Sequence, residues 1–200
     1  MAIVVEHDKR KQEILVKALE VFIEEGYEDV TFQKIADRCG ITRTTLYIYF
    51  KNKREIFLWS IKQLTYGIET RLAELVKDDS KTSESCLRSM LASVVDECEA
   101  NKALFSVLLT YLLSLQKSGG EPGKRVRRRV IRLQHFLSTV IIRGIKAGEF
   151  KKVNVKSANE MFYGLIQSAI FRLSVLDEQT VDDVRDTLNL AVDGILADNK

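Results

Sequence analysis

The chain has 200 residues, of which 46% are hydrophobic and 30% are charged, and its net charge is +3 at pH 7. These values are typical of one or two folded globular domains and exclude a disordered or fibrous chain. The net charge is too small to indicate a nucleic-acid partner by itself. Only one proline and ten glycines interrupt runs rich in Leu, Ala, Glu and Lys, so we expect an all-α fold with short loops.

The first helix is expected from about Asp8 to Glu25, where apolar residues recur at helical spacing. Gly26 follows the last of them, and a glycine in that position commonly ends a helix. The apolar residues that we expect to face the core are Ile14, Leu15, Ala18, Leu19, Phe22 and Ile23.

Two short helices come next. Thr31 can N-cap the first of them, which runs to Cys39 and stops at Gly40. Thr42 is placed to cap the second, which runs through Tyr47. Two short helices joined by a tight turn that contains glycine are typical of a helix-turn-helix, whose second helix enters the major groove of DNA.

The rest of the chain is expected to form longer helices and no strand. Asn52 and Glu55 resemble a capping box for the fourth helix, and Ser157 and Glu160 resemble another for the eighth. Thr180 can cap the last helix. The expected helices beyond the first three run from about 52 to 76, 83 to 100, 102 to 117, 124 to 147, 157 to 175 and 180 onward, which makes about nine helices in all.

The last two of these helices carry more apolar residues than one core face requires. Such helices are either central to one domain or meet their copies in a second chain as a two-fold four-helix interface. The pattern itself does not choose between these alternatives.

Positive charge is concentrated in the segment that contains the two short helices, between Thr31 and Arg54. Six basic residues stand there against one acidic residue, Asp37. Such clustering is an electrostatic footprint typical of a nucleic-acid-binding surface. The six basic residues are Lys34, Arg38, Arg43, Lys51, Lys53 and Arg54.

The second short helix offers side chains that suit base edges. The planar guanidinium of Arg43 matches the O6 and N7 acceptors of guanine, and the amide of Gln33 on the preceding helix suits adenine. Thr44 and Thr45 can contact a phosphate or a thymine methyl group. Ile48 is left with two alternatives, a contact with a thymine methyl group or packing against the neighbouring helices.

The segment VTFQKIADRCGITRTTLYIYFKNKREIF resembles the helix-turn-helix of the tetracycline-repressor-like (TetR/AcrR) transcriptional regulators. The shared pattern is an N-capping Thr, an Ile-Ala pair, Gly, an aliphatic residue, Ser or Thr, then Leu-Tyr-x-Tyr/His-Phe and a later Lys. The resemblance is specific from about Ile14 to Phe57 and implies base readers at Gln33, Arg43 and Thr44. It implies phosphate contacts at Thr31, Thr42, Thr45, Tyr47, Tyr49 and Lys53.

The resemblance also implies a domain plan and partners. Residues 1–53 would form the DNA-binding domain, and residues 54–200 the ligand-binding and dimerisation domain. A homodimer would read a pseudo-palindromic DNA operator, most often as a repressor, and an unidentified small-molecule ligand would release it. The implied dimer residues on the last two helices are Leu165, Ala169, Leu173, Val184, Leu188, Ala191 and Ile195.

Aromatic and lone polar residues on apolar helices are candidates for the ligand pocket, with ordinary core packing as the alternative. His135 is the preferred polar anchor among them. The candidates are Trp59, Tyr66, Phe105, Leu109, Leu112, His135, Phe136, Met161, Phe162 and Gln167.

The cysteines and one basic run have plain interpretations. Cys39, Cys86 and Cys98 lack metal-ligand or CxxC spacing, so we expect no metal and no cofactor. We interpret them as small buried hydrophobes, with a thiol redox sensor as the alternative. The run from Lys124 to Arg132 is the densest block of charge, and we interpret it as a solvated or dimer-flanking face.

The sequence allows two rival functions to be compared with a ligand-responsive regulator. An enzyme is not expected, because there is no nucleophile elbow, phosphate-cradling glycine loop or metal spacing. The alternative to a ligand-responsive regulator is a ligand-independent DNA-binding protein, acting in constitutive repression or chromosome organisation.

No export signal is visible, and the apolar run from Ala103 to Leu115 is shorter than the about 20 residues of a membrane span. We therefore expect a bacterial-type cytoplasmic protein associated with the nucleoid.

Overall fold

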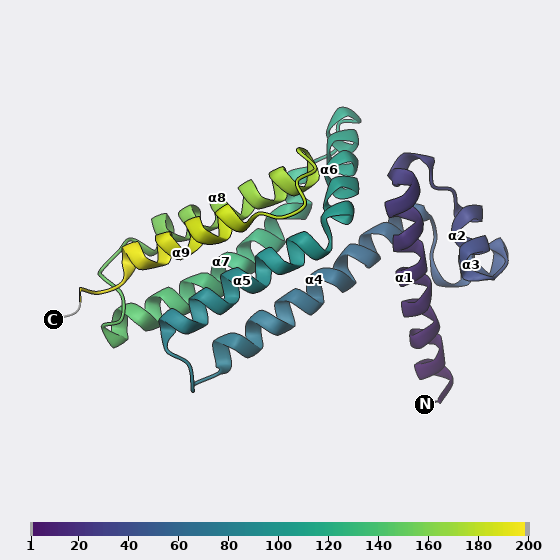
Figure 1. Ribbon diagram of the computed structural model, residues 1–200. Coiled ribbons are helices and arrows are strands. Elements are labelled where there is room, and N and C mark those ends of the chain that lie inside the picture. Colours follow the sequence, from purple (N-terminus) through teal and green to yellow (C-terminus); the bar gives the residue numbers. More distant parts are fainter. Residues whose placement is uncertain (1, 199–200) are drawn as a thin grey trace. The chain divides into compact units, whose positions relative to one another are not determined.

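The computed structural model describes residues 2–198, together with the side chains of all of these except residues 2–6, 64, 122 and 124–126. Within that range the chain forms nine α-helices, which confirms the all-α prediction (Figure 1). They are α1 (Ala2–Asp29), α2 (Phe32–Cys39), α3 (Arg43–Tyr49), α4 (Lys53–Lys77), α5 (Ser83–Ala100), α6 (Lys102–Lys117), α7 (Pro122–Ala147), α8 (Val155–Ser174) and α9 (Asp182–Ile195).

The chain divides into two compact units. The head unit comprises residues 1–66 and 106–120, and the body unit comprises residues 67–105 and 121–200. Two helices contribute to both units, because the division falls within α4 after Tyr66 and within α6 after Phe105. The head unit therefore takes in more of the chain than residues 1–53, which the sequence assigns to the DNA-binding domain.

Local signals set the helix ends in the head unit. Gly26 adopts φ 78° and ψ 159°, so it interrupts the helical run of α1 at the residue where the sequence predicts an end. Thr31 caps α2, because its Oγ1 accepts a hydrogen bond from the backbone N–H of Lys34 at 3.2 Å. Gly40 ends α2 in the left-handed conformation with φ 66°, as the sequence predicts.

The core of the head unit forms where α1, α2, α3 and the start of α4 turn their apolar sides toward one another. Phe22 of α1 and Phe57 of α4 are fully buried, and their rings meet edge to face with centres 4.9 Å apart. Six residues of α1 are predicted to face this core. The prediction is wrong for Ile23, because 38% of its surface is exposed. Leu19 is half-buried, and the other four are buried.

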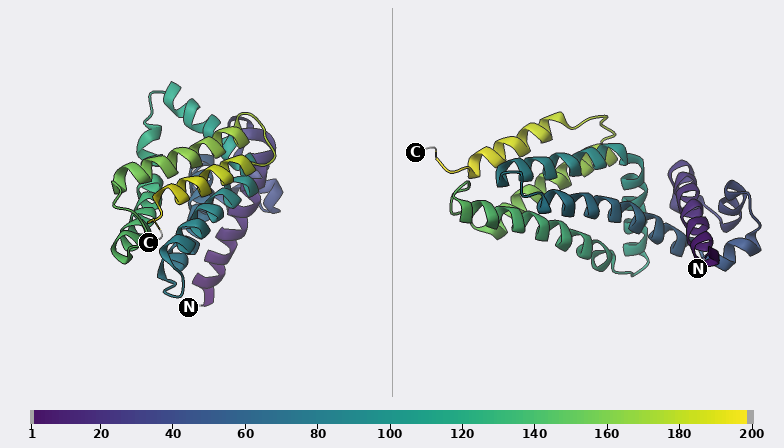
Figure 2. Two further views of the ribbon diagram at one scale, coloured as in Figure 1. Left: turned by 60° about the vertical axis from the view of Figure 1, so that its left-hand side comes forward. Right: turned by 90° about the horizontal axis from the view of Figure 1, so that it is seen from below.

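In the body unit, α5, α7, α8 and α9 pack against one another around an apolar core, and Figure 2 presents them from two further sides. Met90, Leu137 and Phe162, from three different helices, are fully buried there. Gly148 ends α7 with φ 75°, as predicted. Dense packing of this kind makes the core sensitive to small changes in side-chain volume.

Two predicted helix starts in the body unit are wrong. Asn154 caps α8 instead of Ser157, because its Oδ1 accepts a hydrogen bond from the backbone N–H of Ser157 at 3.0 Å. The last helix begins at Asp182, and its first turn has no side-chain cap from Thr180. Ser, Thr and Asn all suit an N-cap, so composition leaves the position uncertain by a few residues where several of them stand close together.

The apolar surplus on α8 and α9 is largely used within one chain. Five of the predicted dimer residues are buried in the core of the body unit, so that prediction is wrong for them: Ala169, Leu173, Val184, Leu188 and Ile195. Leu165 and Ala191 are half-buried at the edge of that core. Hydrophobic spacing identifies a face that is covered, but it does not say whether the same chain or a second chain covers it.

Gly144 on α7 lies against the ring of Phe150, which is 3% exposed. A Cβ atom at this position would stand 2.2 Å from Cδ2 of that ring. Gly144→Ala is therefore expected to destabilise the body unit by about 1 to 3 kcal/mol in urea unfolding, because a buried ring must move. Gly67→Ala is the matched control, since a Cβ there meets nothing within 4 Å. Equal stability of the two variants would contradict the expected clash.

The cysteines are buried. Burial raises the pKa of the thiols of Cys39 and Cys86, and it raises the pKa of Cys98 to about 12. Protonated, inaccessible thiols are poor nucleophiles, so these residues fit small buried hydrophobes and not a redox sensor.

The basic run at the start of α7 is partly neutralised within the chain. Arg129 and Arg132 both pair with Glu69 of α4. Arg127 and Arg128 are exposed, whereas the side chains of residues 124–126 lie outside those that the structure describes. No helix in the described part of the chain is long and apolar enough to cross a membrane.

Candidate nucleic-acid interface

The short helices α2 and α3 turn their apolar sides inward and leave a polar face exposed. Phe32 and Ile35 of α2 and Leu46 of α3 are buried in the head unit. Arg43 and Thr44, in the first turn of α3, are exposed. In a helix-turn-helix this first turn is the part that reaches base edges in a major groove.

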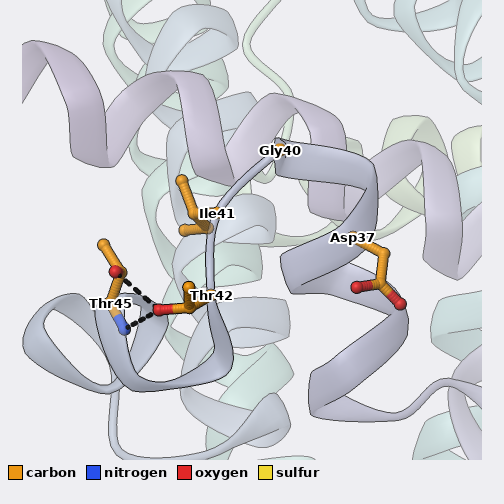
Figure 3. A pocket seen from close by; sticks show the side chains of 5 residues that line it. All are labelled: Asp37, Gly40, Ile41, Thr42 and Thr45. Carbon is orange, nitrogen blue, oxygen red and sulfur yellow. Dashed lines mark hydrogen bonds between the residues drawn. The ribbon is translucent and has the colours of Figure 1, made fainter.

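An open hollow of about 620 Å³ lies at the turn between the two short helices (Figure 3). It is lined by Asp37, Gly40, Ile41, Thr42 and Thr45. The Oγ1 of Thr42 accepts a hydrogen bond from the backbone N–H of Thr45 at 3.0 Å, and the two hydroxyl oxygens are 2.8 Å apart. Thr42 therefore caps α3 as predicted, and both hydroxyl groups lie beside an open surface.

Two of the predicted base-reading side chains have partners within the chain. One guanidinium nitrogen of Arg43 donates to the hydroxyl of Tyr47 at 3.2 Å, and the guanidinium carbon lies 5.7 Å from the centre of that ring. The Nε2 of Gln33 donates to Oδ1 of Asp37 at 2.7 Å. Tyr47 thus orients Arg43, whereas Gln33 must leave Asp37 before both ends of its amide can meet an adenine.

The aromatic residues of α3 are supported by other helices. Tyr47 packs on Phe32 with ring centres 4.5 Å apart, although 49% of its surface is exposed. Tyr49 stacks on His7 of α1 at 4.6 Å. The sequence does not indicate His7, because only the fold brings the start of α1 beside α3. Ile48 is 69% exposed, so the packing alternative is wrong and the thymine contact stays a prediction.

Lys53 occupies a different place from the one the resemblance implies. Its ammonium group donates to the backbone carbonyls of Tyr27, Glu28 and Val30 at 2.9, 2.8 and 2.9 Å. These carbonyls belong to the end of α1 and the residue just after it, where helical partners run out. An ammonium group has three N–H donors, so none is left for a phosphate while these bonds hold.

Both cations of α2 are paired with carboxylates of α1. Lys34 pairs with Glu25, and Arg38 pairs with Glu24 and lies 3.5 Å from Glu20. The hydrogen bond from Arg38 lowers the pKa of the Glu24 carboxyl group. The concentration of positive charge read from residues 31–54 is therefore reduced in space, because the balancing carboxylates come from an earlier part of the chain.

The ten residues predicted to line the ligand pocket are divided between the head unit and the body unit. Trp59 and Tyr66 line a cleft between α1 and α4 in the head unit. Phe162 is fully buried in the core of the body unit, and Phe105 and Phe136 pack against that core. The remaining five are Leu109 and Leu112, half-buried in the α6 part of the head unit, and the exposed His135, Met161 and Gln167. His135, the preferred polar anchor, is exposed in the single chain, and a surplus of aromatic residues does not tell which neighbour covers them.

Two capped short helices and an exposed first turn that carries Arg43 define this chain as a helix-turn-helix DNA-binding protein. Residues 14–58 match the family model for bacterial regulatory proteins of the tetR family. The chain is 28% identical over 188 residues to the fatty acid metabolism regulator protein of Bacillus subtilis (strain 168). The alignment covers 92% of this chain and 94% of that protein.

Solved structures with the same fold extend over nearly the whole chain. A TetR transcription regulator from Haloarcula marismortui superimposes with a TM-score of 0.83 at 23% identity, covering 94% of this chain and 99% of that one. The transcriptional regulator FadR from Bacillus subtilis, in complex with stearoyl-CoA, superimposes with a TM-score of 0.72 at 24% identity, covering 91% and 95%. The match at residues 14–58 shows a helix-turn-helix of the tetR type, and the superpositions show that the chain has the fold of TetR regulators.

Proposed function

We propose that the protein is a homodimeric repressor that binds a pseudo-palindromic operator and is released from it by a small-molecule ligand. The observation that carries the DNA-binding part is the exposed first turn of α3, held by the Thr42 cap. In this proposal Gln33, Arg43 and Thr44 read bases. The residues that contact phosphates are Thr31, Thr42, Thr45, Tyr47 and Tyr49. Lys53 is not among them, because its ammonium group donates hydrogen bonds to backbone carbonyls at the end of α1.

The operator can be found by selecting bound duplexes from a random DNA pool. We expect a two-fold related pair of half-sites whose centres are about one helical turn, or 34 to 36 Å, apart. Fluorescence anisotropy with the selected duplex and a scrambled duplex then measures specificity. Equal affinity for both duplexes at matched salt would leave only the sequence-independent term and would count against an operator-reading repressor.

The proposed dimer surface is the exposed side of α8 and α9, not the buried stripe that the sequence suggests. Phe171 on α8 and Val175, the residue directly after α8, are 53% and 54% exposed, and Leu190 on α9 is 69% exposed. Gly164 precedes Phe171 by two helical turns, and a Cβ there would meet nothing within 4 Å in the single chain. Large apolar side chains beside an open glycine suit a close two-fold helix contact.

Exchanging Phe171 and Leu190 for aspartate is expected to convert the dimer into a monomer, because two charges would be buried against an apolar partner surface. Sedimentation equilibrium measures the change in mass, and anisotropy should record a parallel loss of affinity for the full operator. Val16→Asp is the control, since Val16 is 52% exposed on α1 in the head unit, outside the proposed surface. A double variant that remains dimeric would place the interface elsewhere.

A long-chain acyl-CoA is the ligand class that we propose. The support is the relationship to a fatty acid metabolism regulator along almost the entire chain, together with the fold shared with a regulator that holds stearoyl-CoA. The core of the body unit is apolar and includes the flexible side chain of Met90, so it suits an acyl chain if its helices move apart. Such a ligand acts only if it binds the opened form more tightly.

The α6 helix offers a route from the body unit to the head unit. Its first turn lies in the body unit, where the ammonium group of Lys102 donates to Oε1 of Gln179 at 2.7 Å. Its later part lies in the head unit, where the ring of Tyr111 meets Tyr27 at 4.5 Å and Phe57 at 5.1 Å. A shift of α6 would therefore press on the ends of α1 and α4 that support the short helices.

The ligand response is tested with stearoyl-CoA, free coenzyme A and stearate, each added to the complex of protein and selected operator. We expect stearoyl-CoA alone to release the DNA and to raise the melting temperature of the free protein. If none of the three changes operator affinity and a wider thermal screen finds no stabilising compound, the ligand-independent alternative replaces this part of the proposal.

A further inference from the structure

A cleft between α1 and α4 in the head unit has no role in the function described so far. Its volume is about 330 Å³, and its floor includes Leu15, which is 4% exposed. It is lined by Asp8, Lys11, Gln12 and Leu15 from α1 and by Trp59, Lys62, Gln63 and Tyr66 from α4. Two ammonium groups against one carboxylate give this lining a balance that favours an anion.

Both lysines are held over the same indole ring. The ammonium nitrogen of Lys62 lies 4.2 Å from the centre of the Trp59 ring, and that of Lys11 lies 4.4 Å from it. Among the described side chains, no carboxylate forms an ion pair with either lysine. The ring thus holds two positively charged groups close together. Neither charge is neutralised, because an aromatic ring carries no net negative charge.

The cleft continues the surface of α3. Lys11 also lies 5.3 Å from the ring of Phe50, the residue directly after α3. His7, one helical turn before Lys11, stacks on Tyr49 of α3. A strand that touches Tyr49 can therefore continue along His7 to Lys11 without leaving the head unit.

We propose that this cleft binds a backbone phosphate of the DNA that flanks each half-site, with Lys11 and Lys62 as its two ligands. The proposal rests on the proposed operator binding. It also supplies charge where α2 does not, since Lys34 and Arg38 are paired with carboxylates of α1. The contact is independent of base sequence, and the affinity that it adds falls as the salt concentration rises, because the release of counterions from DNA then gains less entropy.

The test uses the full chain and two duplexes, one that ends at the edges of the selected operator and one extended on both sides. Trp59 is the only tryptophan, so its fluorescence reports on the cleft. We expect a change in emission with the extended duplex and little change with the short one. For Lys11→Gln with Lys62→Gln, the salt slope on the extended duplex is expected to fall by about one per bound protomer, because one phosphate contact is lost.

Lys9→Gln with Lys17→Gln is the matched control, since it removes the same charge from exposed positions of α1 outside the cleft. It should alter the two duplexes equally. Lys11→Arg with Lys62→Arg keeps both charges and should restore the slope, which separates phosphate binding from a merely structural contact.

Three results would overturn the inference. Equal salt slopes for the unaltered chain and the Lys11→Gln, Lys62→Gln variant would make the contact structural only. A response of Trp59 to inorganic pyrophosphate at constant ionic strength, without a response to extended DNA, would make the cleft a site for a free anion. Failure of the unaltered chain to bind any duplex would instead remove the proposed function itself.

Discussion

Lys53→Met is expected to destabilise the head unit by about 2 to 3 kcal/mol, because hydrogen bonds from a charged donor to otherwise unpaired carbonyls are among the stronger ones. The variant removes the group that holds the carbonyls of Tyr27, Glu28 and Val30 and ties the end of α1 to the start of α4. Hydrogen exchange of the α1 amides, together with urea unfolding, measures this loss. Lys51→Met is the control, since Lys51 is exposed and nearby.

The same variant decides between two roles for Lys53. The family resemblance implies a phosphate contact, whose loss would lower the salt slope of DNA binding by about one and leave stability nearly unchanged. The geometry instead predicts lost stability and an unchanged slope once the protein is folded. An unchanged unfolding curve with a reduced slope would restore the phosphate role and would mean that Lys53 leaves the end of α1 when DNA binds.

Arg43→Ala is expected to weaken binding to the selected operator by roughly 1 to 3 kcal/mol and to relax the preference at one base pair. The physical reason is the loss of the planar fork that matches guanine in the major groove. Anisotropy with the operator, with single-base variants and with scrambled DNA measures both effects. An equal loss on scrambled DNA would contradict a base-reading role.

Tyr47→Phe tests how Arg43 is positioned. The hydroxyl of Tyr47 accepts a hydrogen bond from the guanidinium group at 3.2 Å, so its removal should cost a smaller part of operator affinity, about 0.5 to 1.5 kcal/mol. In the Arg43→Ala background the loss should shrink to the part that comes from the proposed phosphate contact of Tyr47, because no guanidinium group is left to position. Fully additive losses would contradict a role of Tyr47 in positioning Arg43.

The helix-turn-helix is the part of the fold that the sequence predicts best. Thr31, Gly40 and Thr42 act through contacts within a few residues, so the caps and the turn can be read from the chain in order. The exposed positions of Arg43 and Thr44 follow from the same local geometry. The prediction is weaker for α8 and α9, where several residues suit a cap and the choice of Asn154 depends on how the helix meets its neighbours.

By itself, the sequence determined the helical class, the helix count, the helix-turn-helix and the side chains of its exposed turn, because these depend on propensity, spacing and capping over short distances. Only the tertiary structure decided which basic side chains stay unpaired. Carboxylates of α1 form ion pairs with Lys34 and Arg38, and backbone carbonyls at the end of α1 accept hydrogen bonds from Lys53. The tertiary structure likewise decided that the apolar stripe of α8 and α9 is buried in its own chain. Partners across long sequence separations arise from packing, and no local pattern carries them.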